Sequence, residues 1–264
     1  MRIVGLGRIL FAIASASLAI WSLAWGDFGW GAQSLLAWIP WRASWVYGSA
    51  LITLAASAGL CFSRTALAGV WTIGAYQAVG VAISVPQILS RPLGVDAWYS
   101  FFEALTPLVA AGLLYVMLRP QSRGAATPMA AVRAARALFG LGCVFYGWSH
   151  FLYADYTATL VPAWLPGHMA FAYFTGFAHV AAGLAILIGT FAHLAATLEA
   201  VMMSLFGLLV WVPSLFAHPP PKWATPPQHQ WSELVMTLVL AASAWVVAIS
   251  LRNRSRASAW ASRV

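Results

Sequence analysis

The chain has 264 residues, of which 62% are apolar and only 8% are charged, and its mean hydropathy is +0.80. A soluble domain of this length has about a quarter of its residues charged, so the composition excludes an ordinary soluble enzyme. The net charge of +8 would suggest nucleic acid as the partner of a soluble protein. Here the basic residues follow a membrane topology instead, so we expect the lipid bilayer as partner and no nucleic acid.

Eight apolar stretches, each close to the roughly 20 residues that a helix needs to cross a bilayer, follow one another along the chain: 6–26, 44–63, 66–89, 98–118, 134–154, 170–191, 195–216 and 231–251. Backbone groups at bilayer depth must be satisfied within a helix, so we predict an all-α fold with eight transmembrane helices. The first stretch also resembles a signal peptide, with Ser22-Leu23-Ala24 as a passable cleavage site. The internal repeat argues against cleavage, because the counterpart of this stretch lies in mid-chain.

The basic residues are distributed unevenly between the two ends of these helices. Only Arg42, Arg91 and Lys222 fall on one side, and the others all fall on the opposite side: Arg2, Arg8, Arg64, Arg119, Arg123, Arg133, Arg136, Arg252, Arg254, Arg256 and Arg263. Positive residues mark the cytoplasmic side of a membrane protein. We therefore predict a bacterial inner-membrane protein with both termini and the central linker in the cytoplasm.

The two halves of the chain match at an offset close to 128 residues. Rare polar and turn-forming residues recur in pairs: Arg8 and Arg136, Asp27 and Asp155, Trp38 and Trp164, Pro40 and Pro166, Pro86 and Pro213, and Glu103 and Glu233. Apolar membrane sequence aligns by chance, but rare charged residues do not. We predict a tandem duplication of a four-helix unit, with repeats at 1–120 and 133–264, a linker at 121–132, and the two repeats parallel, related by about half a turn around the membrane normal.

The paired acids fall on the predicted outer side. Asp27 and Asp155 follow the first helix of each repeat, and Glu103 and Glu233 are expected in the first turn of the fourth. An acid in a first turn complements the helix dipole. The alternative interpretation is a pair of outward-facing polar sites, one per repeat, that bind a polar head group or move protons.

Most of the 15 tryptophans also map to the outer half, among them Trp148, Trp164 and Trp231. Some form an interfacial belt, but an excess on one side suggests an aromatic-rich outer structure. The loops 29–42 and 157–168 are too apolar for ordinary solvated loops, and we interpret them as interfacial or re-entrant segments.

Imidazoles occur in the second repeat where the first has none. Ser22 corresponds to His150, Leu51 to His179 and Arg91 to His218, which points to the second repeat as the active one. His179 is expected near mid-membrane, as a functional group or as a hydrogen-bonded core residue. His179 and His193 have the 14-residue spacing of stacked haems, but no second helix shares it, and His150 is expected about 8 Å nearer the outside. We therefore expect no haem and predict no metal site.

The run from Gly147 to Asp155 (GWSHFLYAD), continuing through 160–167 (LVPAWLPG), Thr175-Gly176 and 181–185 (AAGLA), resembles the DoxX-like family of bacterial membrane proteins. That family is built on a four-helix unit, so a duplicated unit would cover nearly the whole chain. The resemblance implies association with quinone-linked redox enzymes or a role in assembly. It supplies no catalytic residues.

These observations predict an accessory or redox subunit with an outer-side apolar pocket for a quinone. We expect His150, Asp155 and Glu233 as proton-carrying residues in a cavity walled by tryptophans, with further ligand contacts from a larger set: Trp148, Trp164, His179, Trp231, His218, Asp27 and Glu103. A partner membrane or periplasmic subunit is expected. The alternatives are a non-enzymatic assembly protein that grips another subunit, or a small transporter with its pathway between the repeats and helix breaks at Pro86 and Pro213.

Overall fold

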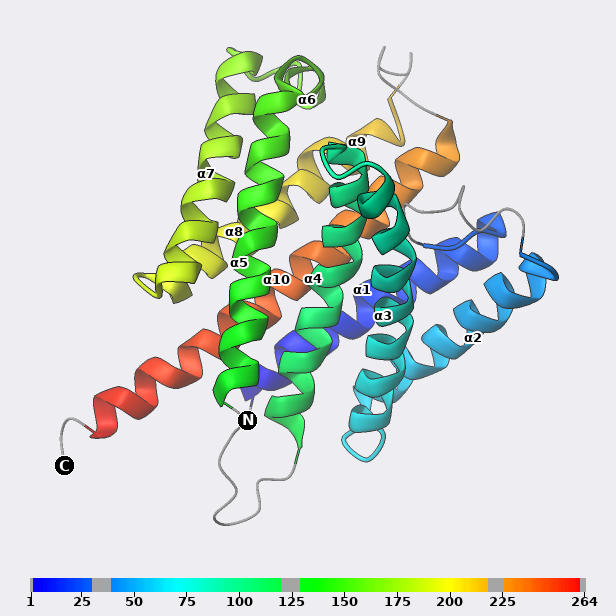
Figure 1. The fold of residues 1–264 in the computed structure, drawn as a ribbon, viewed down its shortest axis with the longest axis vertical. Coiled ribbons are helices and arrows are strands. Elements are labelled where there is room, and N and C mark those ends of the chain that lie inside the picture. Colours follow the sequence, from blue (N-terminus) through cyan, green and yellow to red (C-terminus); the bar gives the residue numbers. More distant parts are fainter. Residues whose placement is uncertain (1, 30–38, 120–128, 218–225, 262–264) are drawn as a thin grey trace.

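The structure is a computed structural model that describes residues 2–29, 39–119, 129–217 and 226–261, with side chains described only between residues 5 and 252. Every regular element in these ranges is helical: α1 (Arg2–Trp25), α2 (Arg42–Cys61), α3 (Ala66–Ser90), α4 (Val95–Leu118), α5 (Met129–Leu152), α6 (Ala154–Leu160), α7 (His168–Ile188), α8 (Ala192–Phe206), the π-helical segment η2 (Gly207–Trp211), α9 (Val212–Ser214) and α10 (Pro227–Ala261) (Figure 1). The predicted all-α fold is confirmed.

Eight helical segments in the described ranges are long and apolar enough to cross a membrane. They are α1, α2, α3, α4, α5, α7, the continuous run α8–η2–α9, and α10. The short helix α6 lies between the fifth and sixth spans. The start of α1 and the end of α10 lie at the same end of the bundle as the end of α4 and the start of α5 (Figure 1), as an even number of spans requires.

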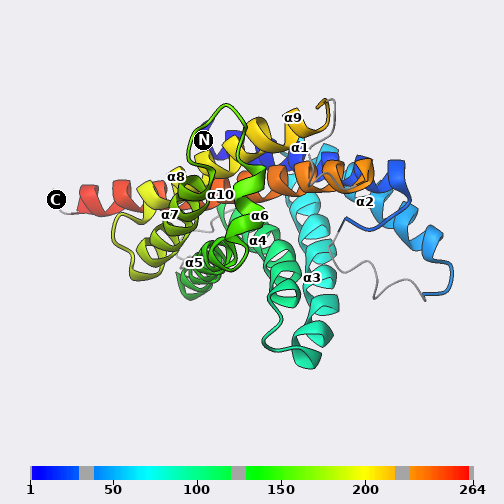
Figure 2. The same cartoon turned by 90° about the horizontal axis from the view of Figure 1, so that it is seen from above.

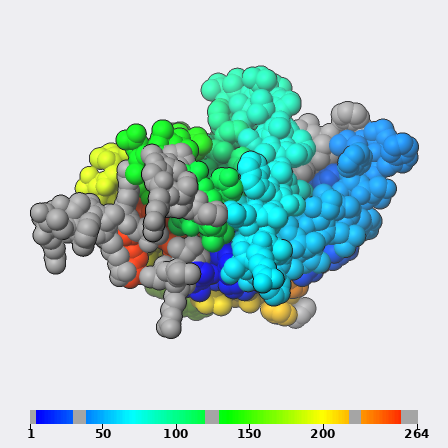
Figure 3. All heavy atoms as spheres, turned by 90° about the horizontal axis from the view of Figure 1, so that it is seen from below, coloured from blue at the N-terminus to red at the C-terminus, as the bar shows by residue number. Residues whose placement is uncertain are grey.

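Both halves pack their helices in the same order. In the first half α1 packs on α2, α2 on α3 and α3 on α4; in the second half α5 packs on α7, α7 on α8 and α8 on α10. The contacts between halves are also reciprocal, since α1 meets α10, α4 meets α5, and α4 meets α10. From below, α2 and α3 (blue to cyan) fill one side of the molecule and α5 (green) the other (Figure 3).

Helix α10 forms the centre of the bundle. In its spanning segment Pro227–Arg252, 83% of the most apolar window is buried, and it contacts α1, α4 and α8. Figure 2 shows α10 running beside α1 along the length of the molecule. Its apolar residues, among them Val239, Val246 and Val247, are fully buried, so this helix contributes most to the common core.

Helix breaks are predicted at Pro86 in the first half and at Pro213 in the second, and of these two positions only Pro213 has an irregular segment beside it. Helix α3 runs without interruption through Pro86, so the predicted break there is wrong. Pro213 does follow an irregular segment, because the seventh span passes through the π-helical η2 immediately before it. Neighbouring helices in a membrane protein supply the packing that keeps a proline-containing helix continuous.

Candidate functional site

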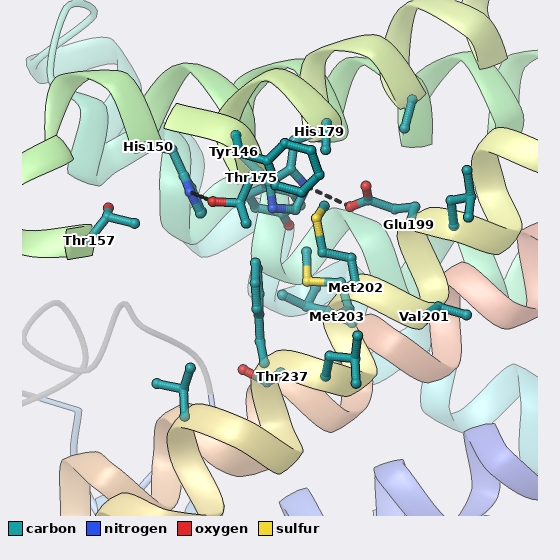
Figure 4. A pocket seen from close by; sticks show the side chains of 18 of the residues that line it. Tyr146, His150, Thr157, Thr175, His179, Glu199, Val201, Met202, Met203 and Thr237 are labelled. Atoms are coloured by element: carbon teal, nitrogen blue, oxygen red, sulfur yellow. Dashed lines mark hydrogen bonds and ion pairs between the residues drawn. The ribbon is translucent and has the colours of Figure 1, made fainter. Parts of the chain in front are cut away.

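A cavity of about 700 Å³ lies between α7 and the seventh span, which meet at the turn after Ile188 and diverge from it (Figure 1). Its remaining walls come from α5, α6, α10 and the outer part of α4. Most lining residues are apolar or aromatic, and Figure 4 shows some of them with the polar residues. In the described structure, only Tyr99 and Glu103 of the first half line this cavity.

The part of the cavity wall that α7 and α8 contribute is apolar and exposed. Phe174 on α7 and Leu194 and Leu198 on α8 line the cavity, and 54–65% of their surface is exposed. Because both helices are membrane spans, we expect access to this wall from the hydrocarbon phase rather than from water.

The polar centre of the cavity is a histidine–glutamate pair. Nδ1 of His179 on α7 lies 2.8 Å from Oε1 of Glu199 on α8, and both side chains are only 1% exposed. The two residues face each other across the cavity wall in Figure 4. Ionisable groups so deep in a membrane protein are costly and mark functional positions, and the hydrogen bond to Glu199 fixes the ring orientation of the histidine.

A second histidine completes this cluster. The His150 ring lies 5.0 Å from the His179 ring, centroid to centroid, so the expected axial separation of about 8 Å does not keep them apart. His150 Nδ1 lies 2.9 Å from Thr175 Oγ1, and Phe206 stacks on its ring with centroids 6.0 Å apart. We call His150, His179 and Glu199 the polar cluster.

Glycines bring α5 and α7 close enough to form it. A Cβ on Gly147 would lie 2.5 Å from the Gly176 carbonyl oxygen, and one on Gly183 would lie 2.5 Å from that of Gly140. Contacts of that length are impossible, so only glycine permits this approach of the two backbones, as in other tightly packed membrane helices. His150 and His179 each lie three residues beyond one of these glycines, on the same helix face.

All three glutamates of the chain line this one cavity: Glu103, Glu199 and Glu233. Glu103 on α4 and Glu233 on α10 are close enough to interact electrostatically, at the interface of the two halves. No lysine or arginine is among the described residues that line the cavity. A chain with a net charge of +8 therefore encloses a cavity whose ionisable residues are acids, histidines and tyrosines.

The interpretation of Glu103 and Glu233 as first-turn residues is wrong. Helix α4 begins at Val95 with Asp96 as its first-turn acid, and α10 begins at Pro227 with no acid in its first turn. Each glutamate therefore lies beyond the first turn, where the dipole effect has faded. Their position in the cavity wall accounts for them better.

The structure brings together four of the predicted site residues, His150, His179, Glu103 and Glu233, and separates the others from them. Asp155 lies in the first turn of α6, is exposed and does not line the cavity. Trp148, Trp164 and Trp231 are 55%, 70% and 42% exposed and also lie outside the lining. The expected wall of these three tryptophans is wrong: phenylalanines, leucines, methionines and Trp211 line the cavity instead.

The remaining predicted residues have other surroundings. Asp27 forms an ion pair with Arg42 and lies 3.4 Å from Gln228 Nε2, so it links α1, α2 and α10 rather than binding a ligand in this cavity. His218 lies outside the described residues. His193 is exposed and belongs to α8, not to the helix of His179, so the 14-residue spacing does not stack along one helix. No group of three or more metal-ligating side chains occurs in the described ranges.

The end of the cavity away from the α7–α8 turn lies under α6. Thr157 and Leu160 of this helix line it. Burial, with a smaller contribution from the Glu233 carboxylate, raises the pKa of the Tyr156 phenol. The phenol therefore senses the charge of a cavity residue from outside the spanning helices.

Sequence reasoning missed Glu199, which belongs to none of the repeated acid pairs. The signal was present, since it is an acid inside an apolar span. We compared the whole chain with known proteins, and no family model, curated protein or solved structure matches it. The DoxX-like resemblance therefore stays a prediction.

Proposed function

We propose that this chain is a DoxX-like accessory or redox subunit that binds a quinone-type ligand in the cavity between α7 and α8. One observation carries the proposal: an apolar cavity of about 700 Å³, reachable from the hydrocarbon phase, contains a buried His–Glu pair. Small-molecule sites combine largely apolar walls with a few placed polar groups. The isoprenoid tail of a quinone suits the apolar walls, and its oxygen-bearing head suits the polar groups.

Ligand extraction and ligand binding test this function. Protein purified in mild detergent is extracted with organic solvent, and the extract is analysed for quinones by absorption and mass. Decylubiquinone binding is measured by quenching of tryptophan fluorescence. The Ala178→Trp variant fills the cavity and should abolish both signals. Ala170→Trp, at an exposed α7 position outside the lining, is the matched control. No quinone in the wild-type extract and no quenching would refute the proposal.

The exposed tryptophans favour a second function, the gripping of another membrane or periplasmic subunit. Trp41 and Trp164 are 82% and 70% exposed at the end of the bundle opposite the termini. Aromatic residues of this kind serve both membrane interfaces and protein contacts. A transporter between the repeats ranks below both, because the lining of the cavity comes almost wholly from the second half.

We further propose a location in the bacterial inner membrane with cytoplasmic termini, supported by the distribution of basic residues. In a background with Cys61 and Cys143 replaced by serine, a cysteine introduced at Ala224 should react with a membrane-impermeant maleimide in intact cells exposing the periplasm. A cysteine at Ala125 should react only after lysis. The reverse pattern would invert the topology.

The duplication is also part of this proposal. The same packing order in the two halves and the reciprocal contacts between them support two parallel repeats, as do the recurring residues. An experimental structure in which residues 1–120 and 130–252 superpose by about half a turn around the membrane normal is the expected result. An inverted relation would refute it.

A further inference from the structure

The polar cluster lies in the wall of the cavity and contains hydrogen-bond acceptors. Oε1 of Glu199 is occupied by His179, whereas Oε2 is buried and has no hydrogen-bond partner. The Cys143 thiol lies next to this carboxylate, but a thiol is only a weak donor. A buried carboxylate oxygen without a partner carries a desolvation cost that a donor on a ligand would remove.

His150 adds a second acceptor. The Thr175 hydroxyl donates its one proton to the backbone, since Oγ1 lies 2.9 Å from the Phe171 carbonyl oxygen and 3.1 Å from that of Ala172. It therefore accepts from His150, whose Nδ1 carries the ring proton. The opposite nitrogen, Nε2, then holds a lone pair, as neutral imidazole requires.

Acceptors on the protein call for donors on the ligand. A quinone carries carbonyl oxygens, which accept, whereas the corresponding hydroquinone carries two hydroxyl groups, which donate. Among the described lining residues there is no lysine or arginine to donate to a carbonyl, and the hydroxyl groups of Tyr146 and Thr175 are already hydrogen-bonded within the protein. We propose that the Glu199 carboxylate and His150 bind the hydroxyl groups of a lipophilic hydroquinone and select it over the quinone.

This inference rests on the proposed function and specifies the ligand further, as the reduced form. It concerns binding alone and requires no electron acceptor. His179 is a positioning residue, because it holds Oε1 and so directs Oε2. The aromatic rings of Tyr146 and Phe206, 6.2 Å and 5.9 Å from the His179 ring between centroids, provide faces against which an aromatic head can stack.

The test compares four probes on wild-type protein in nanodiscs under anaerobic conditions, by fluorescence quenching and thermal shift. They are decylubiquinol, decylubiquinone, the dimethyl ether of decylubiquinol, and decylamine. We expect the hydroquinone to bind at least about tenfold more tightly than the quinone, which is about 1.4 kcal/mol. The dimethyl ether, which keeps the shape and lacks both donors, should bind no better than the quinone.

Glu199→Gln should remove the preference for the hydroquinone, because the amide nitrogen that replaces Oε2 donates to a quinone carbonyl instead of accepting from a hydroxyl. Cys143→Ala is the matched neighbour control, with the preference retained. Equal binding of hydroquinone and quinone to the wild type would overturn the inference and leave the proposed function standing. Failure of both to bind would end both. Tight binding of decylamine alone would show that the cavity takes cations, and it would also overturn the inference. The comparison of hydroquinone and quinone binding to the wild-type protein tests the inference even if the Glu199→Gln variant does not fold.

Discussion

The two halves of the chain pack their helices in one order but differ in what they enclose. In the second half, His150, His179 and Glu199 meet in a cavity. If the halves are repeats, as we propose, the first half has Ser22 and Leu51 at the histidine positions. At the offset that relates Pro86 to Pro213, Thr72 takes the place of Glu199. Leu51 is 57% exposed, and Thr72 hydrogen-bonds only its own helix.

The comparison separates the requirements of the fold from those of the site. The helix order is the same in both halves, so it describes a packing solution for a four-helix unit. The buried acid and the two imidazoles occur in one half and cost stability wherever they are unpaired. A protein keeps such groups for a function, and the four predictions below compare corresponding positions of the two halves.

The largest effect is expected for His179→Ala, which leaves the Glu199 carboxylate buried without its partner. Removing the partner of a buried acid costs about 3–5 kcal/mol where the pair is ionised and about 1–3 kcal/mol where it is neutral. Thermal unfolding in detergent should show a strongly lowered melting temperature. Leu51→Ala, at the corresponding lipid-facing position, should change it little. Equal effects of the two substitutions would mean that the His–Glu pair does not stabilise the second half.

The glycine at the helix interface gives the next effect. A Cβ on Gly176 would lie 2.6 Å from Phe151 Cε1 and 3.0 Å from His150 Cβ, whereas one on the corresponding Gly48 has nothing within 4 Å. Gly176→Ala should therefore destabilise by about 1–3 kcal/mol through overpacking. Gly48→Ala should be neutral or stabilise by up to about 1 kcal/mol, since alanine favours a helix. Matching losses in the two melting curves would contradict the close packing of α5 on α7.

Substitutions of Asp27 and Asp155 should differ less in their effect on stability than the two glycine substitutions do. Asp27 pairs with Arg42, and their side chains are 16% and 28% exposed, whereas Asp155 is exposed. Asp27→Ala should cost about 1 kcal/mol, the upper end for partly exposed ion pairs. Asp155→Ala should leave the midpoint of unfolding unchanged. A proton-carrying role for Asp155 would instead appear as lost activity in the native complex without any loss of stability.

The smallest effect concerns Tyr156. Burial is the larger cause of its raised pKa, and the Glu233 carboxylate adds to it. Glu233→Gln should lower the pKa of this phenol toward its ordinary value without reaching it, so that tyrosinate appears at a lower pH. Glu103→Gln, the corresponding change in the first half, should not. The measurement is the ultraviolet tyrosinate titration, with Tyr156→Phe subtracted in each background. Equal changes in the pKa of Tyr156 in the Glu233→Gln and Glu103→Gln variants would show that Glu233 has no specific influence on this phenol.

The sequence was sufficient to predict the spans, because apolar stretches of bilayer length leave no other fold available. It predicted less well where helices begin: Pro227 and Val95 start their helices several residues before the strongly apolar runs, which moved Glu233 and Glu103 out of first turns. Depth alone could not predict that the rings of His150 and His179 meet, since their contact depends on glycines that bring two backbones together. Whether Trp148 and Trp231 line the cavity depends on the direction in which each side chain projects from its helix. Hydropathy carries no information on that direction.

The π-helical segment η2 (Gly207–Trp211) has a consequence for how the seventh span presents its side chains. In a regular α-helix each residue advances about 100°, so Trp211 would point about 120° away from Glu199 around the axis. A π turn holds more residues and advances less per residue, which brings Trp211 back toward the side of Glu199, and both residues line the cavity. Replacing this segment by an α-helix of the same length would turn Trp211 away from the cavity. The π winding of the segment therefore sets which side chains the span presents at this end of the cavity.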